Sequence, residues 1–118
     1  MIYLCNTFSL HMLEYMHCGK AQRVEVQRIS AQDAGNLLRK NAFRSFFGHR
    51  HSAWHLGRYL HVTIPVCRGT IRLRPQDRLL IAAIQSKREW EQGWKGCPGW
   101  RFFLVSVEES GDDHDDRS

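Results

Sequence analysis

The sequence predicts an α/β fold in which helices flank a mixed β-sheet. Two observations support this prediction. Short apolar or alternating runs, which are typical of strands, are separated by longer segments with apolar residues at helical spacing. The chain has 118 residues, of which 42% are hydrophobic. It is therefore long enough for one domain with a well-packed core and too short for two.

Strand-like segments differ in how apolar they are. Residues 79–84 form the most apolar run, so we expect this strand at the centre of the sheet. Residues 23–29 alternate between apolar and polar side chains, which is typical of a half-exposed strand. Pro65 places its segment at an edge or a bulge, because proline has no N–H to donate. The expected strands are, in chain order, 2–5, 23–29, 62–66, 70–73, 79–84 and 101–108.

Capping residues mark two helix starts. Ser9 is an expected N-cap, because apolar residues follow it at helical spacing. Ser30 is followed three residues later by Asp33, which resembles a capping box and predicts a helix over 31–39.

A third helix is expected after residue 52, and residues 41–48 and 87–99 are expected to be loops. The apolar face of this helix holds residues at helical spacing, namely Ala53, Leu56 and Leu60.

Charge is distributed unevenly along the chain. Six of the twelve acidic residues lie at positions 108–118, whereas residues 1–107 hold 16 basic and six acidic residues, a formal charge of +10. The high positive charge of residues 1–107 favours a polyanionic partner, such as a nucleotide or a nucleic acid. We therefore expect one domain over 1–108 and a disordered acidic tail over 109–118.

Composition also excludes several classes of protein. No apolar run is long enough to span a membrane, and the N-terminus lacks the features of a signal peptide, so we expect a cytoplasmic protein. The four cysteines include no Cys-x-x-Cys pair, which argues against a zinc ribbon and for reduced thiols.

The first segment with chemical potential covers residues 3–13, Tyr-Leu-Cys-Asn-Thr-Phe-Ser-Leu-His-Met-Leu. It reads as a strand that passes through a polar turn into a helix, and a helix N-terminus offers free N–H groups to a phosphate. Asn6, Ser9 and His11 would add side-chain donors there. The alternative is ordinary capping, in which Ser9 serves only the helix.

The second segment is Gly-His-Arg-His-Ser at residues 48–52, just before the third helix. A histidine in a loop that leads into a helix can lie beside a bound phosphate, and imidazole transfers protons near neutral pH. Two alternatives compete with a role for His49 in proton transfer. His49, His51 and His55 could bind a metal, since His51 and His55 lie one helical turn apart, although no acidic residue lies nearby to complete a site. The histidines could also be ordinary surface residues.

The third segment is Arg-Glu-Trp-Glu-Gln-Gly at residues 88–93, after the expected central strand. Ligands of α/β proteins bind beyond the carboxyl ends of such strands. Arg88 could pair with a phosphate through two hydrogen bonds, and a glutamate could hold a hydroxyl or orient the histidine. The alternative is a solvated charged loop.

Together these segments resemble the viral ring nucleases, the type III anti-CRISPR proteins, which have cellular relatives in CRISPR loci. Residues 3–13 match the family's Tyr-Leu-x-Asn-Ala-Phe-Ser-(Ile/Leu)-Asn-Met-Leu except at Thr7 and His11. Residues 48–52 stand where the family carries Gly-His-x-(Ser/Ala)-Thr. Residues 88–93 are similar to the family's Arg-Leu-x-Glu-Gly, with one residue inserted, and residues 104–107 to its closing Leu-Val-x-Val.

The resemblance implies a roughly five-stranded mixed sheet and a homodimer that holds cyclic tetra-adenylate across its interface. The family cuts this ring to linear di-adenylates with 2′,3′-cyclic phosphate ends, which switches off type III CRISPR signalling, and it uses no metal or other cofactor. By resemblance His49 is the general acid, with Arg88 and Glu91 in the same pocket. Because of the insertion, Glu89 is an alternative acid. The implied ligand-binding residues are Asn6, Ser9, Leu10, His11, Gly48 and Ser52.

Two other functions remain open from the residues. One is a sponge that binds a cyclic oligoadenylate without cutting it. The other is a small basic RNA- or DNA-binding module, which the +10 charge of residues 1–107 favours. The ring nuclease reading expects no membrane partner and no long nucleic acid.

Overall fold

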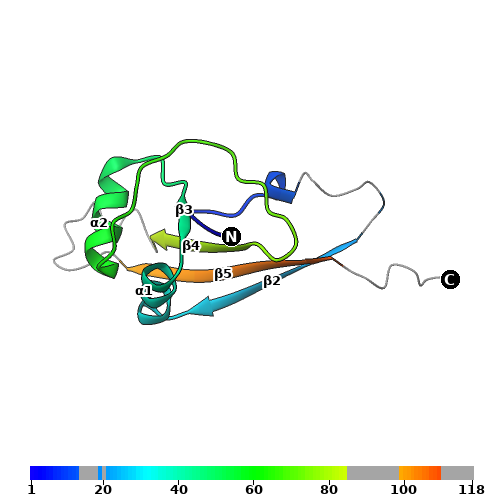
Figure 1. Ribbon diagram of the computed structural model, residues 1–118, viewed down its shortest axis with the longest axis horizontal. Helices are drawn as coiled ribbons and strands as arrows, with labels where there is room; N and C mark the ends of the chain where they lie inside the picture. The colour runs from blue at the N-terminus through cyan, green and yellow to red at the C-terminus, as the bar shows by residue number, and fades with distance from the viewer. Residues whose placement is uncertain (14–18, 20, 85–98, 110–118) are drawn as a thin grey trace.

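A computed structural model describes residues 1–13, 19, 21–84 and 99–109. It contains a five-stranded sheet in the order β2-β5-β4-β1-β3 (Figure 1). The strands are β1 (Ile2–Cys5), β2 (Gln22–Ile29), β3 (Phe43–Ser45), β4 (Arg78–Ile84) and β5 (Trp100–Glu109). The helices are α1 (Ala31–Lys40) and α2 (Arg50–Leu60), and Leu10–Leu13 forms a 3-10 helix, η1.

The sheet is mixed, as the sequence predicts. β1 runs parallel to both of its neighbours, β3 and β4. β5 runs antiparallel to β4 on one side and to β2 on the other. The apolar segment at 79–84 occupies the middle position, as β4, which confirms the prediction for the central strand. Because β1, β3 and β4 share a direction, their carboxyl ends point to the same edge of the sheet.

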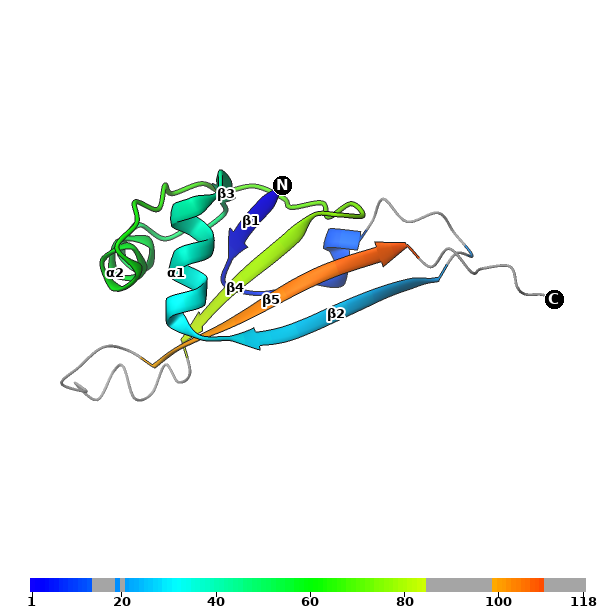
Figure 2. The same ribbon diagram turned by 60° about the horizontal axis from the view of Figure 1, so that its bottom comes forward.

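Two hydrophobic clusters cover the two faces of this sheet. One face packs against α1 and α2, and Leu80 and Phe102 belong to that cluster. On the other face, Leu79 and Val105 pack with residues of η1 and with Ile71, in the segment before β4. Alternation along a strand sends neighbouring side chains to opposite faces, which explains why Leu79 and Leu80 belong to different clusters. Figure 2 shows α1 and η1 on opposite sides of the sheet.

The helix expected over 31–39 is confirmed as α1. The Ser30 hydroxyl accepts a hydrogen bond from the Asp33 N–H at 3.0 Å, so Ser30 is the N-cap. Leu38 is buried, while Leu37 is partly buried against the same cluster.

The apolar face expected for the third helix is also confirmed, because Ala53, Leu56 and Leu60 are the buried residues of α2. This helix begins at Arg50, earlier than predicted, with His49 as its N-cap. It ends at Leu60, and the left-handed backbone of the C-cap His61 (φ 57°, ψ 48°) closes the last turn.

Two expected strands, at 62–66 and 70–73, are not strands. Residues 62–66 make only one isolated bridge, between Val66 and Phe47, and Pro65 removes a donor from the segment. Ile71 and Leu73 are buried, but their segment pairs with no strand. Ile71 and Leu73 alternate with polar residues because both side chains pack on the sheet. This alternation is the same as the one that a strand shows.

Two further expectations need correction. The loop expected over 41–48 contains the short edge strand β3, at Phe43–Ser45. The α-helix expected after Ser9 is the 3-10 helix η1 over its described part; residues 14–18 lie outside the described residues. Ser9 does cap this turn, since its hydroxyl accepts from the His11 N–H at 3.3 Å.

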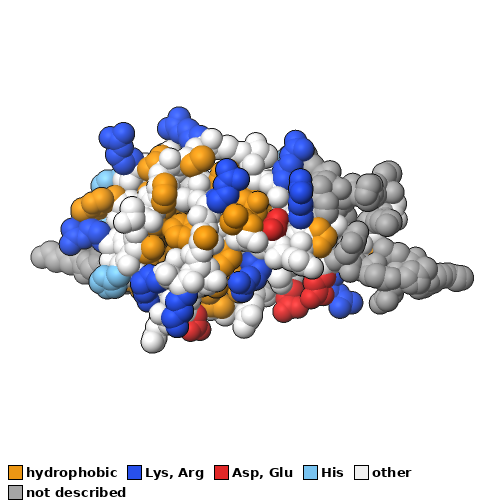
Figure 3. Space-filling model, viewed as in Figure 1, with side chains coloured by type: hydrophobic (Ala, Val, Ile, Leu, Met, Phe, Trp, Pro, Cys, Tyr) orange, Lys and Arg blue, Asp and Glu red, His pale blue; other side chains and the backbone are white. Residues whose placement is uncertain are grey.

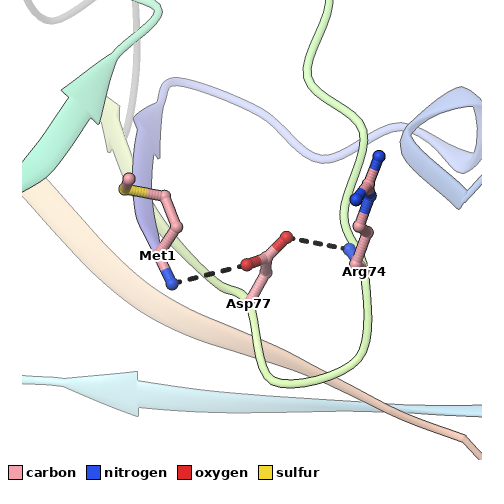
Figure 4. A network of polar contacts seen from close by, with 3 residues as sticks. All are labelled: Met1, Arg74 and Asp77. Carbon is pink, nitrogen blue, oxygen red and sulfur yellow. Dashed lines mark hydrogen bonds and ion pairs between the residues drawn. The ribbon is translucent and has the colours of Figure 1, made fainter.

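A polar network ties the N-terminus to the turn before β4 (Figure 4). One carboxylate oxygen of Asp77 accepts from the Arg74 N–H at 3.0 Å, and the other lies 3.4 Å from the Met1 ammonium. This network closes the turn at residues 74–77 and sets the start of β4 beside the start of β1.

Over its described residues, the chain has no helix of the length and apolar character needed to cross a membrane. Two of the four cysteines lie in this part, Cys5 buried and Cys67 exposed, and both are free thiols.

Candidate functional site

The carboxyl ends of the parallel strands bring two of the three predicted segments to one edge of the sheet. Asn6 follows β1, and the run Phe46–His49 follows β3, the neighbour of β1. A hydrogen bond from the Phe46 N–H to the Leu4 carbonyl oxygen, at 2.8 Å, continues the contact beyond the ladder. β4 also ends at this edge, at Ile84, but the third segment, with Arg88, Glu89 and Glu91, lies outside the described residues.

His49 occupies the N-cap of α2 with an exposed side chain. Its carbonyl oxygen accepts from the Ala53 N–H at 3.0 Å, while its imidazole makes no capping hydrogen bond. Histidine is not among the residues that cap helices well, and α2 therefore begins without a side-chain cap. The first N–H groups of α2, including that of the half-buried Ser52, point toward the N-terminal end of the helix, where the helix dipole stabilises a bound anion.

Arg68 lies directly beside this helix start, and the sequence reasoning did not identify it. Its Nε donates to the Gly48 carbonyl oxygen at 3.2 Å. Its side chain also packs along the backbone of Gly48, where a Cβ would lie 3.4 Å from Arg68 Cγ. The bridge between Val66 and Phe47 brings Arg68 close to Gly48, and no local pattern in the sequence predicts that contact.

Arg68 also lines a pocket of about 580 Å³ that holds four arginines. Phe46 lies in it, with the Arg44 guanidinium 5.8 Å and the centre of the Tyr3 ring 5.9 Å from the centre of its own ring. The polar and charged lining side chains are Tyr3, Arg44, Cys67, Arg68, Thr70, Arg72, Arg74 and Asp77. Figure 3 shows basic side chains along the upper border of this view. The pocket therefore suits an anion that also presents a flat apolar surface.

Ser9, Leu10 and His11 lie elsewhere. Ser9 precedes η1, and Leu10 and His11 belong to it. This turn packs on the face of the sheet opposite to α2. A hydrogen bond from the Leu73 N–H to the Met12 carbonyl oxygen, at 2.7 Å, joins it to the segment before β4. In Figures 1 and 2, α2 lies at one end of the molecule and η1 lies apart from it, nearer the middle of the long axis. One subunit therefore does not bring Ser9, Leu10 and His11 next to His49. Moreover, η1 has only four residues, so its dipole gives a phosphate little support.

His51 and His55 meet on the surface of α2. Their Nε2 atoms lie 3.1 Å apart and their rings pack edge to face. Partial burial lowers the pKa of His55, and the nearby charges of His51 and Arg58 lower it further. Within the described part of the chain, no group of three or more His, Cys, Asp or Glu side chains is placed to hold a metal ion.

A second pocket, of about 670 Å³, lies along α2 beside the segment that follows it. Trp54 is 54% exposed there, and the Arg58 guanidinium lies 4.9 Å from the centre of its ring.

The comparisons with known proteins concern family and fold. The family model described as STIV B116-like matches residues 2–93. The structure is similar to B116 of Sulfolobus turreted icosahedral virus, with a TM-score of 0.67 and 16% sequence identity. The match covers 89% of this chain and 97% of B116, so both chains share the fold over nearly their whole length. A comparison with curated proteins gives no match.

Proposed function

The chain belongs to the STIV B116-like family, and on that premise we propose that it is a metal-independent ring nuclease that cuts cyclic tetra-adenylate. One observation supports the proposal most. His49 stands at the start of α2, which has no side-chain cap, and Arg68 lies beside it. Both are at the edge of the sheet where β1 ends. A proton donor, a cation and free N–H groups are what cleavage of a phosphodiester needs in one place.

The chemistry follows from these groups. A ribose 2′-hydroxyl attacks the phosphorus of its own 3′ phosphodiester, and the bond from phosphorus to the 5′ oxygen breaks. The imidazolium of His49 gives a proton to the leaving 5′ oxygen, and the proton of the 2′-hydroxyl passes to solvent. The products are a 2′,3′-cyclic phosphate and a 5′-hydroxyl. Arg68 and the first N–H groups of α2 stabilise the negative charge that develops on the phosphoryl oxygens.

A homodimer completes the site in this proposal. Within one subunit α2 and η1 lie apart, so in this proposal η1 of a second copy contacts the ring that is bound beside His49. A two-fold axis then presents two His49 side chains to opposite phosphates of one ring. Cuts at both phosphates give two linear di-adenylates and switch off the signal of a type III CRISPR system.

The pocket with four arginines favours a second candidate, a small basic module that binds single-stranded RNA or DNA. Arginines around the half-buried Phe46 suit phosphates and a base, whether or not a ring is closed. The proposed nuclease binds the ring in preference to long nucleic acid, so a direct competition separates the two candidates.

The test incubates the protein with cyclic tetra-adenylate in EDTA and resolves the products by chromatography. We expect linear di-adenylates with 2′,3′-cyclic phosphate ends. Binding without products would support the sponge. Preference for a linear oligoadenylate over the ring would support the nucleic-acid module. Loss of cleavage in EDTA, restored by zinc or manganese, would overturn the metal-independent mechanism.

A further inference from the structure

Two histidines on α2 are placed at the spacing of a chelate. His51 is exposed and His55 is half-buried, one helical turn apart, and their Nε2 atoms are 3.1 Å from each other. The His55 ring also packs edge to face on Trp54, with 4.9 Å between ring centres. Arg58 stacks on the same indole, so Trp54 and the helix together restrict the orientation of the His55 ring.

The spacing of the two nitrogens suits a metal ion. Zinc binds imidazole nitrogen at about 2.0–2.1 Å, so nitrogens 3.1 Å apart subtend roughly 98° at a shared ion. That angle lies between those of octahedral and tetrahedral coordination. The α2 backbone therefore needs no change to hold an ion, and small ring rotations aim both nitrogens at it.

We propose that His51 and His55 form a surface site for a divalent first-row transition metal, with water in the remaining coordination positions. Imidazole is a preferred ligand of Cu²⁺, Ni²⁺ and Zn²⁺, and the general affinity order places Cu²⁺ first. Mg²⁺ and Ca²⁺ prefer oxygen ligands and are not expected to bind. Of the described His, Cys, Asp and Glu side chains, none joins the pair as a third ligand.

Binding changes the hydrogen bond between the two rings but needs no net release of protons from neutral imidazoles. At present one Nε2 donates its hydrogen to the other. Both Nε2 atoms must offer a lone pair to the ion, so the donor ring moves its proton to Nδ1 through solvent. The bound ion then joins the first and second turns of α2, which stabilises the helix that begins beside His49. This site is separate from the proposed cleavage, which uses no metal.

The test is a titration of the full chain with Cu²⁺ and Zn²⁺, followed by calorimetry and by tryptophan fluorescence. We expect one ion per subunit, quenching of the Trp54 emission by Cu²⁺, and a rise in melting temperature. Mg²⁺ should give none of these. His51→Ala and His55→Ala should each weaken binding at least tenfold and abolish the rise in melting temperature. Trp54→Phe should keep most of the affinity and lose part of the quenching.

Two matched variants exclude other ligands. His61→Asn removes a histidine at the other end of α2 and keeps a residue that tolerates the left-handed backbone. Cys67→Ser removes the exposed thiol. Both should bind the metal as the wild type does. Unchanged binding in correctly folded His51→Ala, or loss of binding in Cys67→Ser, would overturn the proposal. No nucleotide is present, so the outcome is independent of ring cleavage.

Discussion

His49 is the residue on which the enzymatic proposal depends most. If it protonates the leaving 5′ oxygen, His49→Ala should slow single-turnover cleavage by roughly 10²–10⁴-fold. Ring affinity should change little, because that proton matters mainly in the transition state. Rapid-quench chromatography with excess protein measures the rate. His51→Ala and His55→Ala are the controls and should retain most of it. Cleavage near the wild-type rate in His49→Ala would contradict the general-acid role of His49.

Arg68 is the cation that the fold adds to this site. Because its guanidinium lies beside Gly48 at the start of α2, Arg68→Ala should weaken binding of cyclic tetra-adenylate. The loss should be larger at low salt, since an exposed phosphate contact is screened by ions. Arg23→Ala is the matched control, an exposed arginine on the edge strand β2, and should bind normally. Equal losses in both variants would point to general charge instead of a local contact.

The choice between Glu91 and Glu89 concerns the segment after β4. The spacing from Arg88 to Glu91 matches the family motif, so Glu91→Ala should slow cleavage more than Glu89→Ala. Both variants remove one carboxylate from the same segment, so each serves as the control for the other. The reverse order in single-turnover rates would show that the inserted residue shifts the match and that Glu89 is the working acid.

At the scale of elements, α2 positions His49, and the stability of this helix depends on two residues near its C-terminal end, Gly57 and His61. A Cβ on Gly57 would lie 2.6 Å from the Val62 carbonyl oxygen, a backbone atom that cannot move alone. Gly57→Ala should therefore destabilise the protein by about 1–3 kcal/mol, although alanine favours helix.

His61→Gly should stabilise the protein by about 1 kcal/mol, because glycine adopts the left-handed backbone without cost.

Chemical denaturation measures both free energies of unfolding. Gly35→Ala in α1 is the comparison for the first variant. There the added Cβ meets the guanidinium of Arg39, the far end of a flexible side chain, so the substitution should cost less than Gly57→Ala. Equal losses at the two glycines would mean that the close approach to Val62 does not decide the outcome.

At the scale of the whole molecule, the separation of α2 from η1 is the reason that the proposed function includes a dimer. We expect a dimer in solution that binds one ring. Light scattering combined with a ligand titration gives both numbers. A monomer that binds one ring per chain would contradict the shared site, and it would also remove the reason for Ser9 and His49 to act on the same ligand.

Local chemistry of the sequence determined much of the fold. The helix over 31–39 follows from the Ser30 cap, and the buried face of α2 follows from Ala53, Leu56 and Leu60. The apolar run at 79–84 predicted the central strand. These features depend on residues within a few positions of one another, so periodicity and capping are enough to predict them. The same holds for the Gly-His motif at the start of α2, which sequence alone singled out.

Tertiary structure alone decided which segments pair and what surrounds the motif. Phe43–Ser45 became a strand because β1 offers it a partner, whereas 70–73 contains more apolar residues and pairs with no strand. Arg68 lies beside Gly48 because a bridge joins two segments that are distant in the sequence, and η1 packs on the face of the sheet opposite to α2. A hydrophobic pattern reports only that a side chain is buried. Its hydrogen-bond partners and neighbours depend on contacts between residues far apart in the chain, which no local pattern specifies.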